Sequence, residues 1–260
     1  MVVVDCVARF GTSAILMAAL AAGPALAQAN DANKILKEMS DYLGSQKNVS
    51  ASFDTDIEVV TPEGQKIQFA SSGHFEMSRP NKLRVSRTGG YADLEVVYDG
   101  KTATAYDKHS NSYIQVDAPG SVNQLVDRLH DKLGVMLPGV VLLSSSAYDV
   151  LTSDLISGAH IGRGVIDGVE CEHLAFRSKD TDWQIWIEVG DRPIPRKYVI
   201  TSKAMAASPQ YTIVIKDWKT DIQPGINVFV FTPPRGAQQL DIKALSSFDD
   251  GHPAAIKEDH

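Results

Sequence analysis

The sequence predicts a mainly β (α+β) fold: a curved antiparallel sheet of about eleven strands, forming an incomplete barrel covered by an N-terminal helix and a helical insertion. Three observations predict this class. Apolar and polar residues alternate with a period of two over residues 53–117 and again over 159–231. A segment with helical spacing precedes the first strand, and another interrupts the strands at about 121–155. Gly, Asn and Asp mark turns between short strands, and a sheet this large is expected to curl.

The first residues have the parts of a secretory signal peptide. Arg9 stands before an apolar stretch at residues 10–22, and Ala25-Leu26-Ala27 follows. A basic residue, a short apolar core and an Ala-x-Ala end predict cleavage after Ala27, and the apolar stretch is too short to span a membrane comfortably. Cys6 precedes the apolar core, so it cannot be the lipidated cysteine of a bacterial lipoprotein. We therefore expect residues 1–27 to be a cleavable signal peptide and the mature protein to be soluble, exported and not lipidated.

The charge and the cysteine count narrow the class of partner and the source of stability. The chain has 25 Lys and Arg against 32 Asp and Glu; loss of residues 1–27 removes Arg9 and Asp5, which leaves 24 against 31. This acidic balance disfavours nucleic acid and anionic membrane surfaces as partners. Only Cys171 remains after cleavage, so an intramolecular disulfide is impossible. Stability must come from an apolar core, for which about 230 residues are enough.

The mature chain begins with an expected helix and a long hairpin. Residues 31–46 are expected to be helical, because Ile35, Met39 and Leu43 recur every four residues. A strand at about 53–59 then places its odd-numbered residues on one face, and Pro62-Glu63-Gly64 reverses the chain. On the returning strand, the apolar residues that share a face are Ile67, Phe69, Phe75 and Met77.

Shorter strands follow on both sides of the helical insertion. Before it, strands are expected at about 82–88, 93–98, 102–106 and 112–117. After it, strands are expected at about 159–166, 169–177, 183–189, 195–203, 210–219 and 228–231.

Trp183 and Trp186 lie three apart, hence on opposite faces of one strand. In the insertion, Ser121 and Gln124 can form a capping box at the start of an amphipathic helix. We expect one domain at residues 28–242 and a disordered, polar tail at 243–260.

The sequence gives little support for catalysis. Gly162-x-Gly164-x-x-x-Gly168 misses the dinucleotide spacing by one residue and falls between two expected strands. The histidines include no His-x-x-x-His pair, and one cysteine cannot build a thiolate zinc cage. Cys171 and His173 share a strand face, so two interpretations stay open: a thiolate pair of a hydrolase, or a small buried cysteine beside an exposed histidine. We expect no catalytic residue, no metal and no cofactor.

Four short motifs in a fixed order carry a resemblance to a known family. They are Val49-Ser-Ala-Ser-Phe53, Arg79-Pro80-Asn81, Asp99-Gly100-Lys101-Thr102 and Phe229-x-Phe231-x-Pro233-Pro234-x-Gly236. In this order they resemble the periplasmic lipoprotein-carrier (LolA/LolB-like) family, across about residues 31–242. The resemblance implies a binding fold that holds acyl chains against the concave face of the sheet. The arginine before Pro-Asn in that family bonds helix carbonyls and keeps a lid shut, which implies a latch role for Arg79.

The ligand-lining residues that this resemblance implies are the apolar alternate residues Ile57, Phe69, Phe75, Met77, Tyr211 and Ile213, whose pattern equally suits a plain core. The segments Asp167–Leu174, Asp182–Ile187 and Pro193–Tyr198 look instead like the exported bacterial family DUF2092 of the same superfamily. We therefore expect a non-enzymatic periplasmic binding protein for a lipid or an acylated lipoprotein. The alternative is an envelope-stress sensor or protein-interaction module with the same fold, which would bind an envelope membrane protein. We expect a monomer.

Overall fold

The computed structural model describes residues 23–90, 93–133 and 138–243, and for 23–28 and 129–138 it describes no side chains. The helices are α1 (Gly23–Ser45), α2 (Val122–Leu133), α3 (Pro138–Val141) and α4 (Ala147–Thr152). The strands before the insertion are β1 (Asn48–Val60), β2 (Lys66–Ser78), β3 (Lys82–Gly89), β4 (Asp93–Tyr98), β5 (Thr102–Asp107) and β6 (Ser112–Asp117). The strands after it are β7 (Leu155–Ile166), β8 (Val169–Ser178), β9 (Thr181–Glu188), β10 (Pro195–Ser202), β11 (Gln210–Lys219) and β12 (Gln238–Leu240).

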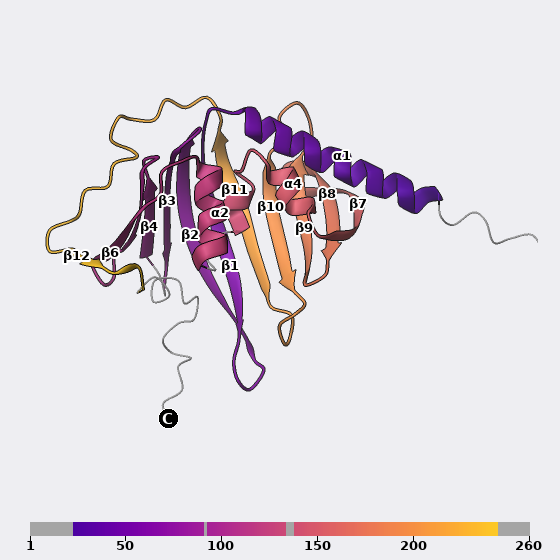
Figure 1. Ribbon diagram of the computed structural model, residues 1–260. Coiled ribbons are helices and arrows are strands. Elements are labelled where there is room, and N and C mark those ends of the chain that lie inside the picture. Colours follow the sequence, from indigo (N-terminus) through magenta and orange to yellow (C-terminus); the bar gives the residue numbers. More distant parts are fainter. Residues whose placement is uncertain (1–22, 91–92, 134–137, 244–260) are drawn as a thin grey trace, which may run out of the picture.

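The strands form one open, curved, twelve-stranded sheet in the order β12-β6-β5-β4-β3-β2-β1-β11-β10-β9-β8-β7. Two consecutive runs, β1 to β6 and β7 to β11, meet where β1 pairs with β11, and all pairs within them are antiparallel. Only β12, among the described strands, pairs in parallel, with β6. The helices lie against one face of the sheet, with α1 crossing β7 to β9 and α2 in front of β2 (Figure 1). The predicted class, a half-barrel covered by an N-terminal helix and a helical insertion, is confirmed, with one parallel pair added.

The first helix starts at Gly23, eight residues before the expected start at residue 31. Ala25, Leu26 and Ala27 are strong helix formers, so local preference favours extending the helix toward the N-terminus. Its buried stripe against the sheet consists of Ala32, Leu36, Met39 and Leu43. The predicted signal peptide and the polar tail lie largely outside the described residues, so both stay predictions.

The capping box and the Asp-Gly turn that the sequence predicts both form. Ser121 and Gln124 form the capping box: Gln124 N–H donates to Ser121 Oγ at 3.3 Å, and Ser121 N–H donates to Gln124 Oε1 at 2.9 Å. In the turn after β4, Asp99 Oδ1 accepts from the N–H groups of Lys101 and Thr102, each at 2.8 Å. Gly100 has φ +93°, a conformation that favours glycine.

The core lies between the concave face and the helices. Gly73 shows how closely it is packed, because a Cβ there would overlap the Phe53 ring and the carbonyl oxygen of Ser86. Trp183 and Trp186 lie on opposite faces, as predicted. Trp183 is buried in the core and stacks on Phe176 with ring centroids 4.1 Å apart, and Trp186 lies on the convex face.

The strand expected at 228–231 is wrong. Residues 220–237 instead form a segment that leaves β11 and passes along the outside of the sheet to reach β12 (Figure 1). Phe231 packs on Tyr106 and Tyr113 of the convex face, with ring centroids 5.7 and 5.3 Å away. Arg84 Nη1 donates to the carbonyl oxygen of Val228 at 2.8 Å. The alternation of phenylalanines here serves side-chain packing, not a strand ladder.

Candidate functional site

The candidate ligand-binding residues share the concave face, and three of them form one row. Ile57 of β1 faces Phe69 of β2 on one side and Tyr211 of β11 on the other. Ile200 of β10 continues the row, because it pairs with Tyr211. All four side chains are half-buried. The row therefore presents four apolar or aromatic side chains on four adjacent strands, toward the β1–β2 hairpin end of the sheet.

The next row toward the core combines a polar pair with a covered apolar residue. Thr55 Oγ1 and Ser71 Oγ lie 2.7 Å apart in a buried hydrogen bond. Ile213, which faces Thr55, is only 5% exposed. Helix α3 lies over this row: a Cβ on Gly139 would be 3.1 Å from Ile213 Cδ1 and 3.9 Å from the Tyr211 hydroxyl. The helical insertion thus reaches the concave face above Ile213 and Tyr211.

Phe75 and Met77 lie deeper, in the closed core. Met77 is fully buried, and Phe75 meets the Trp218 ring edge-on with centroids 5.6 Å apart. Trp218 is fixed in turn by its indole N–H, which donates to the carbonyl oxygen of Pro195 at 2.9 Å. The six predicted residues are therefore on one face but in two environments: Phe75, Met77 and Ile213 are in the buried core, whereas Ile57, Phe69 and Tyr211 border it.

Arg79 lies just after β2 and ties three segments together. Its Nε donates to the carbonyl oxygen of Gln46 at 3.0 Å, and its Nη2 donates to those of Leu43 at 3.2 Å and Leu143 at 2.6 Å. Leu43 lies in the last turn of α1 and Gln46 directly follows the helix, where carbonyls lack partners within the helix. Leu143 lies in the insertion, two residues after α3. Burial lowers the pKa of the guanidinium from its ordinary value, yet arginine stays charged.

Arg79 and the row described above are connected through the helical insertion. Helix α3 lies over Ile213 and, within the row, approaches Tyr211, and the segment that follows α3 is held to α1 by Arg79. Sequence reasoning named Arg79 only through a resemblance and missed Ile200 and Gly139. The alternation in β10 could have singled out Ile200, because Tyr198 and Ile200 share a face with residues of β11. Nothing in the sequence could have placed Gly139 over Ile213, since that contact joins segments more than 70 residues apart.

The environment of Cys171 is the reverse of one that activates a thiol. The side chain is fully buried, and its Sγ donates to the carbonyl oxygen of Val169 at 3.5 Å. Burial raises the pKa of the thiol, so the nucleophilic thiolate is disfavoured. His173 is engaged elsewhere: its Nε2 lies 3.0 Å from Gln184 Oε1, and its ring stacks on Trp186 at 4.1 Å. This geometry fits the interpretation of Cys171 as a small buried residue.

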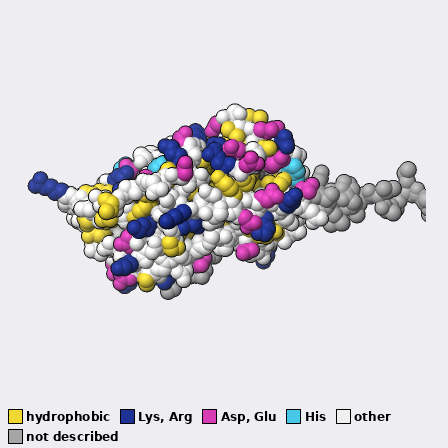
Figure 2. All heavy atoms as spheres, turned by 90° about the horizontal axis from the view of Figure 1, so that it is seen from above, with side chains coloured by type: hydrophobic (Ala, Val, Ile, Leu, Met, Phe, Trp, Pro, Cys, Tyr) yellow, Lys and Arg dark blue, Asp and Glu magenta, His cyan; other side chains and the backbone are white. Residues whose placement is uncertain are grey.

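No group of three or more His, Cys, Asp or Glu side chains in the described part of the chain is arranged to hold a metal ion. No described helix combines the length and the apolar character that a membrane crossing requires. On the face seen in Figure 2, acidic and basic side chains are interspersed, and apolar side chains gather at the end where Figure 1 places β6 and β12.

Comparison with known proteins decides the family. The family described as "Predicted periplasmic protein (DUF2092)" matches residues 32–243, which is most of the chain. The chain belongs to this family. This DUF2092 protein is also similar to an "Outer-membrane lipoprotein carrier protein" of Chromobacterium violaceum, with 36% identity over 97 residues. That match covers 37% of this chain and 41% of the relative, so the chain matches less than half of the carrier's length.

Solved structures of similar proteins are more distant in sequence. An uncharacterised conserved protein from Thermus thermophilus has 11% identity and a TM-score of 0.48, with 81% of this chain and 99% of that chain covered. The LolA superfamily protein NE2245 from Nitrosomonas europaea has 11% identity and a TM-score of 0.39, with 78% and 98% covered.

Proposed function

We propose that this DUF2092 protein is a non-enzymatic periplasmic carrier that holds the acyl chain of a lipid or an acylated lipoprotein against the concave face of its sheet. The observation that carries the proposal is the row Phe69, Ile57, Tyr211 and Ile200. These side chains are apolar or aromatic, adjacent across four strands and only half-buried. A face that served only as core would be expected to close over such a row, as it does over Phe75 and Met77.

Such a site would bind its ligand by burying apolar surface and would catalyse no reaction. Removing apolar surface from water is favourable by about 25 cal/mol per Å², so one acyl chain along the row can bind tightly without a polar anchor. The similarity to a lipoprotein carrier supports this ligand class. The family's description supports a periplasmic location.

We further propose that Arg79 acts as a latch for the helical cover. Its three hydrogen bonds hold the end of α1 to the segment between α3 and α4. Movement of α3 away from Ile213 and Tyr211 would widen access to the Tyr211 side of the row, and the bond from Arg79 to Leu143, two residues after α3, opposes that movement. Ligand entry is therefore coupled to the state of this arginine.

The test is native mass spectrometry of the protein purified gently from the periplasm, followed by organic extraction of whatever is released. A bound mass that extracts as phospholipid or acylated peptide would support the carrier and identify its ligand class. A clean ligand-free mass, together with no uptake of a fluorescent acyl probe, would refute the carrier and favour a protein-interaction module.

The row itself is tested by Ile57→Gln, which places an amide in its centre without removing a fully buried side chain. Acyl-probe uptake should fall by roughly tenfold or more, because a polar group facing an acyl chain loses its hydration without a partner. Thr212→Gln is the matched control, since Thr212 is half-buried on the adjacent strand but on the opposite face. Equal uptake by wild type and both variants would show that the probe binds elsewhere.

A further inference from the structure

The sheet has one long strand edge without a strand partner in the described residues. β7, at the end of the strand order, pairs only with β8 over its twelve residues. The other end of the sheet is different, because the short strand β12 covers part of β6. An unpaired edge presents backbone N–H and C=O groups that readily pair with another strand. In the described part of the molecule, β7 is therefore the one long strand whose outer edge has no strand partner, with α1 packed on one of its faces.

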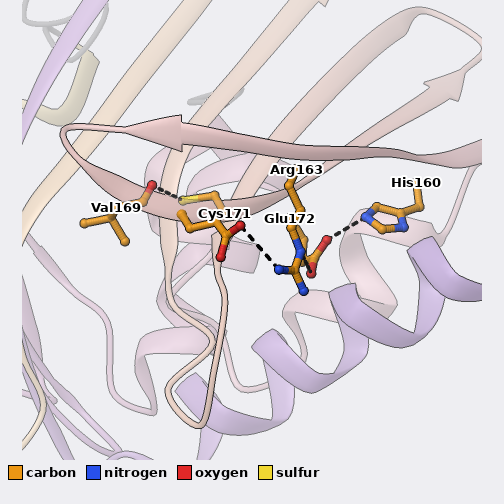
Figure 3. Close-up of polar contacts among 6 residues, drawn as sticks. His160, Arg163, Val169, Cys171 and Glu172 are labelled. Carbon is orange, nitrogen blue, oxygen red and sulfur yellow. Dashed lines mark hydrogen bonds and ion pairs between the residues drawn. The ribbon is translucent and has the colours of Figure 1, made fainter.

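The side chains along β7 do not guard this edge. Ile161 is 56% exposed and Val165 is 67% exposed, and the strand contains neither proline nor lysine. Its one arginine, Arg163, is tied to β8, where its Nε lies 3.1 Å from Glu172 Oε1 and its Nη1 lies 3.3 Å from Glu170 Oε1 (Figure 3). A charged side chain on an edge strand commonly discourages pairing with another strand, but here two carboxylates of the same chain balance the charge of Arg163.

The backbone restricts how a second copy of β7 could pair. The register shifts between His160 and Gly162, so the regular ladder resumes only at about Gly162 and continues to Ile166. In an antiparallel pair related by a two-fold axis, one residue must face its own counterpart, because backbone groups point to the free edge only at alternate residues. Gly164 is at the centre of this stretch. It has no side chain there, and the Trp186 indole lies beside it, since a Cβ on Gly164 would be 3.3 Å from Trp186 Nε1.

We propose that two copies of the protein associate through β7, antiparallel, with Gly164 facing Gly164 across the two-fold axis. Arg163 of one copy then faces Val165 of the other, and its aliphatic stem covers that exposed side chain. The guanidinium stays paired with Glu170 and Glu172 of its own copy, so the contact between copies consists of the backbone ladder and the packing of Val165. A dimer differs from the monomer expected from the sequence, and the mass in solution decides between the two.

A second copy suits this edge better than an open chain of copies. Pairing of unlike edges would generate a filament, but the β6 edge is already partly occupied by β12. Like-to-like pairing uses up the free β7 edge of both molecules, so the assembly closes at two. On the convex side, the Trp186 rings of both copies flank the axis and gain apolar contact.

The first test is the mass of the protein in solution by sedimentation or light scattering, over a range of concentrations. A dimer is expected for the wild type. Val165→Lys places like charge opposite Arg163 of the other copy and should weaken dimerisation by roughly tenfold. Val230→Lys, at a similarly exposed position on the segment outside β6, is the matched control and should leave the dimer unchanged. Unfolding midpoints of the variants establish that both remain folded.

The second test fixes the register. In the double variant Arg163→Cys/Val165→Cys the new thiols face each other across the axis, on the opposite face from buried Cys171. Antiparallel neighbours are close enough for a disulfide, so mild oxidation should give a covalent dimer. A wild type that stays monomeric at the highest concentration overturns the proposal. So does equal weakening by Val165→Lys and Val230→Lys, or a dimer that the cysteine pair fails to trap.

Discussion

Replacing Arg79 with leucine tests both the architecture and the latch. The change removes three hydrogen bonds from a charged donor, to the carbonyls of Leu43, Gln46 and Leu143. Bonds to charged groups contribute roughly 1.5–3 kcal/mol each, and a cation beside the end of α1 adds about 0.3–1 kcal/mol. The gross loss is offset because the partly buried guanidinium no longer has to be desolvated, and because water can reach some of the freed carbonyls.

We expect Arg79→Leu to lower the free energy of unfolding by about 2–4 kcal/mol while the fold persists. Urea unfolding followed by tryptophan fluorescence measures this change, since Trp183 and Trp218 lie in the core. Hydrogen exchange should accelerate mainly at the end of α1 and around Leu143, where the bonds are lost. Arg79→Lys is the matched control, because lysine keeps the charge but cannot reproduce the planar donor geometry.

The latch adds a separate expectation for ligand exchange. In Arg79→Leu the acyl probe should enter and leave faster than in wild type, with Arg79→Lys in between. If Arg79→Leu unfolds within about 0.5 kcal/mol of wild type and exchanges ligand at the same rate, the three bonds neither stabilise the fold nor hold a cover. If stability falls but exchange does not change, Arg79 is a structural residue only.

Two further predictions concern positions outside the latch. Gly73→Ala should lower the free energy of unfolding in urea by about 1–3 kcal/mol, because the new methyl overlaps the Phe53 ring and a backbone carbonyl. Gly90→Ala is the control and should lower it much less, because the space around its Cβ is open. Equal losses in the two variants would contradict this packing. Hydrogen bonds from Lys216 and then Ser72 lower the pKa of Asp54 below its ordinary value. The stabilisation from this carboxylate is therefore present above its ordinary pKa of about 3.8 and is lost as the pH falls through the lower folded-state pKa. Asp54→Asn should reduce the loss of unfolding free energy at acid pH by less than about 1 kcal/mol, since Asp54 and Lys216 are both nearly half exposed. An unchanged dependence of stability on acid pH would show that the Asp54–Lys216 pair contributes nothing.

Much of the fold is readable in the sequence because its signals are local. The alternation in β1 and β2 fixes which residues face the core, and a shift of one residue would turn every apolar side chain outward. The Asp99 turn and the Ser121 capping box follow from short polar side chains that bond their own backbone. These features involve residues at most a few positions apart, so they need no knowledge of the tertiary structure.

Only the tertiary structure decided how segments with the same alternation of apolar residues pack. Phe229 and Phe231 alternate like strand residues, yet Phe231 packs on the convex face, and β12 pairs with β6 only after this segment has passed. Alternation records which side chains are apolar, not whether the backbone finds a partner strand. Ile57 and Met77 likewise follow one pattern, but Met77 is closed in by the helices and Ile57 is not. Burial depends on elements that are distant in the chain, and for that reason the sequence defines the concave face while only the assembled fold separates its core from its open row.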